Sequence, residues 1–97
     1  MRFSWGQAKS AANLVARAFD FEFATLIFDG PTLQREDRRQ DYGERRMIAI
    51  GLAQGVCLTV AFTDRIAANR QGERRIISAR RSNRREHQAY EAALGAT

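Results

Sequence analysis

The first third of the chain carries apolar residues at helical spacing. In residues 6–18 small apolar side chains recur every three to four positions, which predicts an amphipathic helix. Asp20 stands where an N-cap is expected, directly before the apolar run of residues 21–28. That run fits a helix or a strand, and we interpret it as a short helix ended by the Asp29-Gly30-Pro31 turn. The apolar stripe of the first helix consists of Ala8, Ala11, Ala12, Val15 and Ala18.

In the middle of the chain the hydrophobic pattern changes to a period of two. Residues 47–53 and 56–63 are strand-like runs joined by Gln54-Gly55, which predicts a β-hairpin. After a long loop predicted at residues 64–72, residues 73–80 form a third predicted main strand. Alternation places the larger apolar side chains of the second run on one face, and these are Val56, Leu58, Val60 and Phe62.

The remaining segments complete a predicted α+β domain over residues 1–97. Residues 1–5 suit a brief strand or an extended arm, and residues 35–46 are highly charged and partly turn-like. Ser82 or Asn83 is expected to cap a last helix. Its apolar stripe consists of Ala89, Tyr90, Ala93 and Leu94. The order of elements predicts an antiparallel meander sheet of three to four strands with two N-terminal helices and one C-terminal helix. One sheet face should lie under helices, and the other should face solvent or a ligand.

Arginines alternate with apolar residues along the third predicted strand. The alternation places Arg74, Ile76, Ser78 and Arg80 on one face, and Arg75, Ile77 and Ala79 on the other. At least one of Arg74 and Arg75 should therefore face the buried isoleucine side or lie beside a groove. The alternative is that both are solvated near the sheet edge.

Positive charge is concentrated in the second half of the chain. The formal net charge is +5, and arginine supplies all of the 16 basic residues except Lys9. The stretch from Arg65 to Arg85 holds eight arginines with Glu73 as its only acid, whereas residues 1–64 are electrically neutral. Because the planar arginine fork matches phosphate geometry, this distribution indicates a polyanionic partner such as RNA. An acidic protein partner would satisfy the same field.

Several arginines crowd the start of the last predicted helix. They are Arg80, Arg81, Arg84 and Arg85. Cations at a helix N-terminus oppose the helix dipole, and a bound phosphate would relieve that conflict by accepting from both backbone N–H groups and guanidiniums. The alternative is a solvated helix start at which Glu86 compensates part of the charge.

The segment Asp41–Arg46 places a phenol, a carboxylate and two guanidiniums before a strand. RNA can be cleaved without a metal when its 2′-OH attacks the adjacent phosphate and the enzyme orients groups, neutralises charge and moves protons. Arginine cannot act as a base at neutral pH. The candidate bases are Tyr42, Glu44, Asp64 and His87. Glu44 beside Arg46 also fits a plain surface ion pair, and a lone histidine such as His87 fits a structural residue.

Composition excludes several other classes of protein. With Cys57 as the only cysteine no internal disulfide can form, and one cysteine with one histidine cannot complete a zinc site, so we expect no metal or other cofactor. The start MRFSWGQAKS has no apolar signal core behind it. No apolar run approaches the about 20 residues that a membrane span requires. We therefore expect a soluble, cytoplasmic protein without membrane contact.

Short segments of the chain, in their order and spacing, resemble the BrnT toxin family over nearly the whole length. The first are Phe3-Ser4-Trp5 with Lys9 and Asn13, then Phe21-Glu22, Phe28-Asp29-Gly30-Pro31, Asp41–Arg46 and Ile50-Gly51. The most specific portion is Thr63-Asp64-Arg65 followed by Arg75-Ile76-Ile77-Ser78-Ala79-Arg80, with Glu86 and Tyr90 in the last predicted helix.

The resemblance implies a RelE-like fold and a bacterial, metal-independent ribonuclease toxin that stops translation. It also implies a DNA-binding BrnA-type antitoxin as partner in a hetero-oligomer, with operator DNA bound only through the antitoxin. The catalytic candidates at matching positions are Glu44, Arg46, Arg65, Arg75 and Arg80. The RNA-binding candidates are Lys9, which also matches the family, and Tyr42, Arg81, Arg84 and Arg85.

The chain departs from the family pattern in two places. Family members commonly carry Lys-His-Gly after the first helix, where this chain has Ala16-Arg17-Ala18, so any contribution of that histidine to activity is missing. The loop between Arg65 and Arg75 is also longer than usual. Two other functions therefore stay open. One is a non-catalytic module that binds RNA, the ribosome or an acidic antitoxin, and the other is a partner subunit whose arginines contact antitoxin carboxylates.

Overall fold

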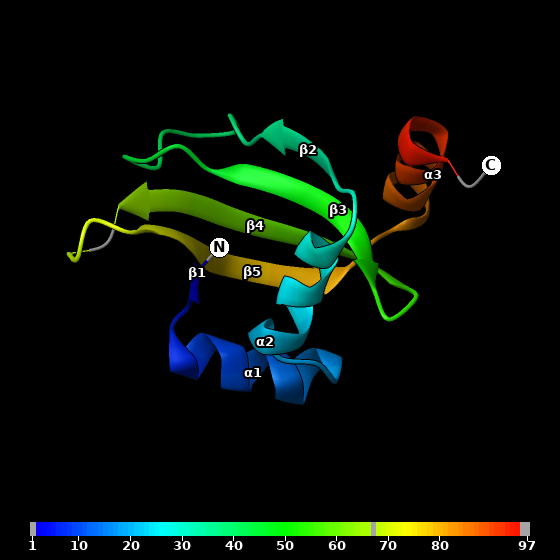
Figure 1. The fold of residues 1–97 in the computed structure, drawn as a ribbon. Coiled ribbons are helices and arrows are strands. Elements are labelled where there is room, and N and C mark those ends of the chain that lie inside the picture. Colours follow the sequence, from blue (N-terminus) through cyan, green and yellow to red (C-terminus); the bar gives the residue numbers. More distant parts are fainter. Residues whose placement is uncertain (1, 67, 96–97) are drawn as a thin grey trace.

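The fold is a mixed α+β domain built on one sheet, as the sequence predicts. The computed structural model describes residues 2–66 and 68–95 (Figure 1). Within these residues five strands form the sheet, and helix α3 follows it. The bounds in chain order are β1 Arg2–Ser4, α1 Gln7–Arg17, α2 Phe21–Ala24, the 3-10 helix η1 Thr25–Asp29, β2 Leu33–Glu36, β3 Met47–Ala53, β4 Val56–Ile66, β5 Gly72–Arg81 and α3 Arg84–Leu94.

The strands lie in the order β1-β5-β4-β3-β2. β1 runs parallel to β5, and the other neighbours are antiparallel. The predicted hairpin is confirmed, because Gln54 and Gly55 have φ values of 47° and 81°, the left-handed region that tight two-residue hairpins use. The β4–β5 turn and the β2–β3 connection lie at one end of the sheet, and α3 lies at the other (Figure 1).

One face of the sheet, here termed the core face, is covered by α2 and η1. Asp20 Oδ1 accepts a hydrogen bond of 2.9 Å from Phe23 N, which confirms the predicted N-cap of α2. Leu58, Val60 and Phe62 of β4 share this face, as predicted, and are buried. The rest of the core cluster consists of Phe19, Phe21, Ala24, Ile27, Ala49, Ala53, Ile76 and Ala79.

A glycine allows η1 to pack closely against β3. The predicted helix over residues 21–28 forms a short α-helix that continues as a 3-10 helix. A Cβ at Gly51 would lie 2.9 Å from Ile27 Cβ and 3.0 Å from Thr32 Cγ2. Because close-packed interiors do not tolerate such separations, a side chain at Gly51 would push η1 away from the sheet.

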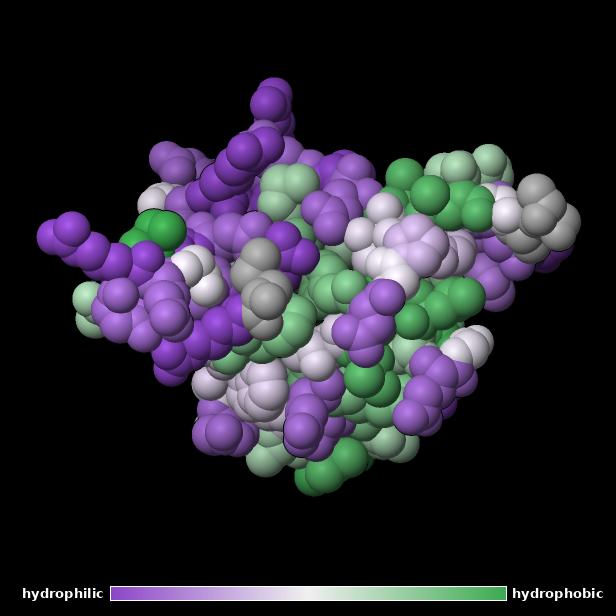
Figure 2. Space-filling view, viewed as in Figure 1, coloured by the Kyte–Doolittle hydropathy of each residue, from purple (hydrophilic) through white to green (hydrophobic). Residues whose placement is uncertain are grey.

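Helix α1 confirms the first predicted helix but turns its polar side inward. Its buried residues are Ser10 and Asn13. Phe21 N donates to Ser10 Oγ at 2.9 Å, and Asn13 Nδ2 donates to Phe19 O at 3.0 Å. The predicted apolar stripe is exposed, with Val15 at 88% exposure, and Figure 2 shows hydrophobic side chains at the surface of this part of the molecule. Hydrogen bonds to the 19–21 segment therefore hold the inner side of α1.

The sheet is larger than the sequence predicts. The prediction of three to four antiparallel strands is wrong, because Arg2–Ser4 adds a parallel edge strand and Leu33–Glu36 pairs with β3. The loop predicted at 64–72 is also wrong at both ends, since β4 continues to Ile66 and β5 begins at Gly72. Cross-strand ion pairs between these charged residues offset their low intrinsic preference for strands.

Candidate nucleic-acid interface

A β-bulge at Ile77 interrupts the pairing of β4 with β5. Ile76 pairs with Phe62 and Ser78 pairs with Ala61, so Ile77 has no partner on β4. Ile77 instead lines a depression between β5 and α1. The extra residue reverses the alternation of every side chain that follows it on β5.

The bulge divides the arginines of β5 between the two faces. Before it, Arg74 lies on the core face, which confirms that one of the first two arginines faces the buried isoleucine side, and Arg75 lies on the opposite face. After it, Arg81 lies on the core face and Arg80 on the opposite face. The predicted grouping of Arg74 with Arg80 is therefore wrong. The opposite face, here termed the open face, also carries Ile48, Ile50, Thr59, Ala61 and Thr63.

Three of the predicted site residues form a row along the open face. Arg75 pairs with Thr63 and Arg80 pairs with Thr59, while Arg65 lies on β4 beyond Thr63. At a rise of about 3.3 Å per residue, the backbone positions of Arg75 and Arg80 lie about 13 Å apart, and Arg65 extends the row to about 20 Å. The structure thus brings the three arginines to one face but spreads them over several phosphate positions.

Arg80 is held at the α3 end of the row by Glu86. Arg80 Nη1 and Nη2 donate to the two Glu86 carboxylate oxygens at 2.7 and 2.8 Å. Asn83 caps α3, as predicted, in a reciprocal pair of 2.8 Å hydrogen bonds with Glu86. Hydrogen bonding from Arg80, and then from the Asn83 backbone, lowers the pKa of Glu86 from 4.5 to about 2 although burial opposes the shift. An ionised Glu86 therefore fixes Arg80 to the start of α3.

The other two arginines of the row differ in their partners. Arg65 Nε lies 2.9 Å from Glu73 Oε2, which also accepts from Ser4 Oγ at 2.9 Å. Hydrogen bonding from Arg65, and to a smaller extent from Ser4, lowers the pKa of Glu73. Arg75 forms no ion pair with any residue that the structure describes. Its guanidinium lies beside Gly6, with Nη2 3.7 Å from the position that a Cβ on this glycine would take. Arg75 thus has a guanidinium free to meet an external anion.

The loop between β2 and β3 is organised by the buried carboxylate of Asp37. This carboxylate accepts from Arg39 Nε and Nη2 at 2.9 and 2.8 Å and from Tyr42 Oη at 3.0 Å. Hydrogen bonding from Arg39 holds the pKa of Asp37 well below its usual range. The Arg46 guanidinium lies 4.0 Å from the centre of the Tyr42 ring, and its Nε donates to Glu44 at 3.1 Å. Tyr42, Glu44 and Arg46 therefore form one local group, with Glu44 as an ion-pair partner.

Two further arginines near the open face were missed by the sequence reasoning. Arg35 pairs with Ile48 across the β2–β3 ladder and shares its face. The charge of Arg39 lies close enough to Arg80 to oppose the rise in the pKa of Arg80 that its carboxylate partner causes. Both lie in the charged run 35–46, where a short strand is hard to distinguish from a solvated loop.

Arg74 and Arg81 lie on the core face, away from the row. The Arg74 guanidinium is 4.7 Å from the centre of the Phe28 ring and 4.3 Å from that of Phe62, and it donates twice to Asp64 at 2.7 and 2.9 Å. Arg81 lines a depression together with residues of α1 and α2. Asp64, a candidate base, is thereby held by Arg74 on the side of the sheet opposite the row.

The remaining predicted site residues lie on the two longer helices. Lys9 is exposed on α1 and lines a depression against β5. Arg84 and Arg85 are exposed at the start of α3. His87 is half-exposed, and its Nε2 lies 3.3 Å from Glu91 Oε1. Lys9, Arg84 and Arg85 therefore lie outside the arginine row.

The end of α1 shows what the departure from Lys-His-Gly does. Arg17 Nη1 donates to Asn13 Oδ1 at 2.9 Å and to Ala79 O at 3.5 Å, so the side chain in the histidine position is bonded both within its own helix and to β5. Ala18 adopts the left-handed conformation with φ of 68°. Glycine enters this conformation without strain, which explains the glycine that the family commonly carries there.

Neither a metal-binding cluster nor a membrane-spanning helix occurs among the described residues. Among residues 2–66 and 68–95, no group of three or more His, Cys, Asp or Glu side chains is arranged to hold a metal ion. In the same part of the chain no helix combines the length and apolar character that crossing a membrane demands. Cys57 is a free thiol, half-buried, whose Sγ lies 3.3 Å from Ser82 Oγ.

Comparison with known proteins gives one family assignment. No curated protein matches the chain. A family model described as the ribonuclease toxin BrnT of type II toxin–antitoxin systems matches residues 5–86. This span contains the whole arginine row and Glu86, and it leaves out residues 1–4 and 87–97, which include most of α3. The chain therefore belongs to the BrnT family of ribonuclease toxins.

Proposed function

We propose that this protein is a metal-independent endoribonuclease toxin that binds single-stranded RNA along its open face. The row of Arg65, Arg75 and Arg80 carries the proposal, because the bulge brings these arginines to one face. A row of about 20 Å matches about six nucleotides at the stacked spacing of about 3.4 Å, and fewer in an extended strand. Basic grooves that follow the backbone are the usual means of binding single strands.

Cleavage in this proposal follows the metal-free route. The 2′-oxygen attacks the adjacent phosphorus, the bond from phosphorus to the 5′-oxygen breaks, and a cyclic phosphate forms. Arg75 has the leading role in charge neutralisation, because a guanidinium without a carboxylate partner can bind two phosphate oxygens and stabilise the charge that develops on them. Arg80, whose direction is set by Glu86, positions a neighbouring phosphate.

Proton transfer requires a different side chain. Arginine stays protonated at neutral pH, and Asp64 is bonded to Arg74 on the core face. Three of the candidate bases remain, namely Tyr42, Glu44 and His87. Tyr42 Oη donates to Asp37, whereas Glu44 is bonded to Arg46 through Oε2 and its Oε1 has no partner among the described residues, so Glu44 is the first to test.

The proposed biological role is inhibition of translation by RNA cleavage in the bacterial cytoplasm. A type II toxin has an antitoxin partner. We propose a BrnA-type antitoxin that neutralises the toxin in a hetero-oligomer and alone contacts operator DNA. Arg81, Arg84 and Arg85, which lie outside the row, serve general RNA attraction or docking to this antitoxin.

RNA degradation by the purified protein in the presence of a chelator tests the proposal. We expect cleavage to survive metal removal and to fall in Arg75→Ala, Arg80→Ala, Arg65→Ala and Glu44→Ala. Arg75→Ala prepared in the same way controls for contaminating nuclease. Intact RNA at high protein concentration under several salt conditions would overturn the catalytic claim.

A non-catalytic binding module is the second candidate function. The ion pairs of Arg46, Arg65 and Arg80 favour it, because a carboxylate beside each guanidinium reduces the charge available for catalysis. It predicts salt-dependent RNA binding without strand scission. Growth arrest on induction, relieved by a neighbouring gene with a DNA-binding motif, would favour the toxin over this module.

A further inference from the structure

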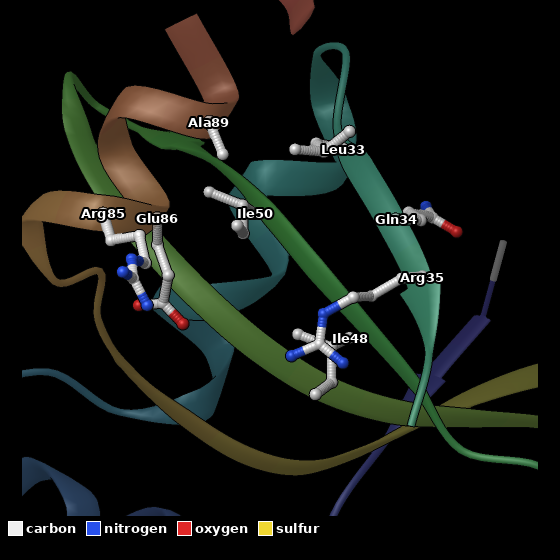
Figure 3. A pocket seen from close by; sticks show the side chains of 8 residues that line it. All are labelled: Leu33, Gln34, Arg35, Ile48, Ile50, Arg85, Glu86 and Ala89. Carbon is white, nitrogen blue, oxygen red and sulfur yellow. The ribbon is translucent and has the colours of Figure 1, made fainter. Parts of the chain in front are cut away.

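A pocket lies on the open face between β2, β3 and the start of α3 (Figure 3). Its volume is about 320 Å³. Ile48 and Ile50 are 7% and 8% exposed and form its floor, and Leu33 and Ala89 add apolar walls. Small-molecule sites span roughly 300–1,000 Å³, so a pocket at the lower end suits a single ring system.

Cationic side chains stand on two sides of this pocket. In Figure 3 the Arg35 guanidinium reaches over Ile48 from β2, and Arg85 and Glu86 face it from α3. In the described part of the chain neither Arg35 nor Arg85 has an ion-pair partner. Glu86 holds the Arg80 guanidinium on its carboxylate. The pocket therefore opens beside the α3 end of the arginine row.

We propose that this pocket binds one unpaired nucleobase of the RNA strand, with the edge of the base on Arg35 and the flanking phosphates on Arg80 and Arg85. The proposal rests on the proposed function as an RNA-cleaving toxin. Proteins that read single-stranded RNA place unstacked bases on aromatic or apolar surfaces while cations hold the backbone. An apolar floor beneath a cationic rim has both properties of such a site.

The polar groups of the pocket favour a base edge that carries acceptors. Glu86 Oε1 already accepts from Arg80 and from Asn83 N, and Oε2 accepts a second bond from Arg80. Arg35 and Arg85 can only donate. Arginine pairs with N7 and O6 of guanine through two hydrogen bonds, so guanine should bind better than adenine, cytosine or uracil.

A side chain of the antitoxin is the competing occupant. An aliphatic or aromatic side chain would cover the apolar floor, but by itself it offers no acceptor to Arg35 and no anion to Arg85. Every base of an RNA strand is flanked by phosphates, which supply that anion. Continuity with the arginine row thus favours RNA.

Filling the pocket tests the proposal. Ala89 is exposed on α3 and points into the pocket in Figure 3, so Ala89→Phe fills it without opening the core. Ala92→Phe, at an exposed alanine of the same helix outside the pocket lining, is the matched control. The probe is a 2′-O-methyl oligonucleotide of about ten nucleotides, within the usual single-strand site sizes, which cannot be cleaved because its 2′-oxygen is blocked. An abasic residue is placed at each position in turn, and circular dichroism verifies that both variants fold.

We expect Ala89→Phe to weaken binding of the intact probe about 10-fold, as loss of one base contact does, and Ala92→Phe to bind like the wild type. In the wild type one abasic position should weaken binding by a similar factor, and in Ala89→Phe that position should have no effect. Among intact probes, guanine at that position should bind most tightly.

Four outcomes would overturn the inference. Equal effects of all abasic positions on binding by the wild type would show that the pocket does not bind a base. Wild-type affinity of Ala89→Phe for the probe would show the same. Both results would leave the proposed function unchanged. A weaker antitoxin complex with unchanged probe binding in Ala89→Phe would assign the pocket to the protein partner. Failure of the wild type to bind the probe or cleave RNA would overturn the proposed function together with the pocket.

Discussion

Two pairs of consecutive arginines on β5 show how differently the two faces of the sheet use the same side chain. Arg74 lies on the core face between the Phe28 and Phe62 rings and bonds to Asp64, while its neighbour Arg75 lies on the open face without a carboxylate partner among the described residues. The second pair repeats the division by face beyond the bulge, but here Arg80 on the open face is bonded to Glu86, and Arg81 on the core face is exposed.

The difference teaches that the density of positive charge does not by itself locate a binding site. An arginine whose guanidinium is covered by aromatic rings and a carboxylate contributes to folding, because its removal leaves unmatched charge and lost packing. An arginine on an uncovered face contributes to stability only weakly and stays available to a ligand. The register at Ile77 decides which role each arginine of β5 has.

Insertion of one alanine between Ala79 and Arg80 changes this division most directly. The added residue would take the place of Arg80 opposite Thr59 and turn Arg80 toward the core face, because a shift of one residue moves all following side chains to the other face. We expect the free energy of unfolding to fall by about 3 kcal/mol, as measured by urea denaturation. Insertion of one alanine after Ala68, in the exposed β4–β5 turn, should cost less than about 1 kcal/mol. Equal stability of the two insertion variants would show that the register of β5 does not constrain the faces.

Comparison of Arg80→Ala with Arg81→Ala tests whether the face on which an arginine lies decides its contribution to RNA cleavage. The two variants remove the same charge from neighbouring positions on opposite faces. Single-turnover RNA cleavage should fall about 100-fold in Arg80→Ala, close to 3 kcal/mol in the barrier, because the guanidinium that positions the neighbouring phosphate is lost. Cleavage by Arg81→Ala should stay within about threefold of the wild type, since its role is at most general attraction. Equal losses in both variants would show that net charge, rather than the face, governs activity.

Arg74→Met and Arg75→Met test how much each arginine contributes to the stability of the fold. Methionine keeps an unbranched apolar stem and removes the charge. Loss of two ring contacts and the ion pair should lower the free energy of unfolding of Arg74→Met by about 2 kcal/mol. The same change at Arg75 should cost less than about 0.5 kcal/mol, as at other surface sites, while cleavage is lost. Thermal or urea unfolding of both variants gives the comparison, and the reverse order of stabilities would contradict it.

The acid stability of the protein tests the carboxylate that positions Arg80. Because the pKa of Glu86 is about 2 in the folded protein against an ordinary 4.5, its stabilisation is complete above pH 4.5 and disappears as the pH falls through about 2. After allowance for solvent screening the effect is about 1 kcal/mol. Glu86→Gln should therefore lose less stability than the wild type between pH 5 and 2. Parallel pH profiles of unfolding for the two proteins would contradict this assignment.

The residues of the candidate site could be named from the sequence, but their arrangement could not. Arg65, Arg75 and Arg80 stand out in the sequence by charge density and family resemblance. The sequence did not show that they share a face, because strict alternation places Arg75 and Arg80 on opposite faces. The bulge that brings them together leaves no clear mark in residues 74–80. Arg35 went unnoticed since β2 is short and charged.

The sequence by itself determined the features that depend on residues a few positions apart. The caps at Asp20 and Asn83 and the turn at Gln54-Gly55 are of this kind, because each satisfies backbone groups within its own segment. Hydrophobic alternation over residues 56–62 likewise identified the face of β4 that packs on the core.

Only the tertiary structure decided the features that join distant segments. Ser4 and Glu73 are 69 residues apart in the chain, and their hydrogen bond accompanies the parallel pairing of β1 with β5. The unpaired Ile77 lies against α1, and that contact belongs to packing rather than to local propensity. The face on which each arginine lies was therefore decided by which side chains could be buried together, a property of the whole fold that no single stretch of sequence contains.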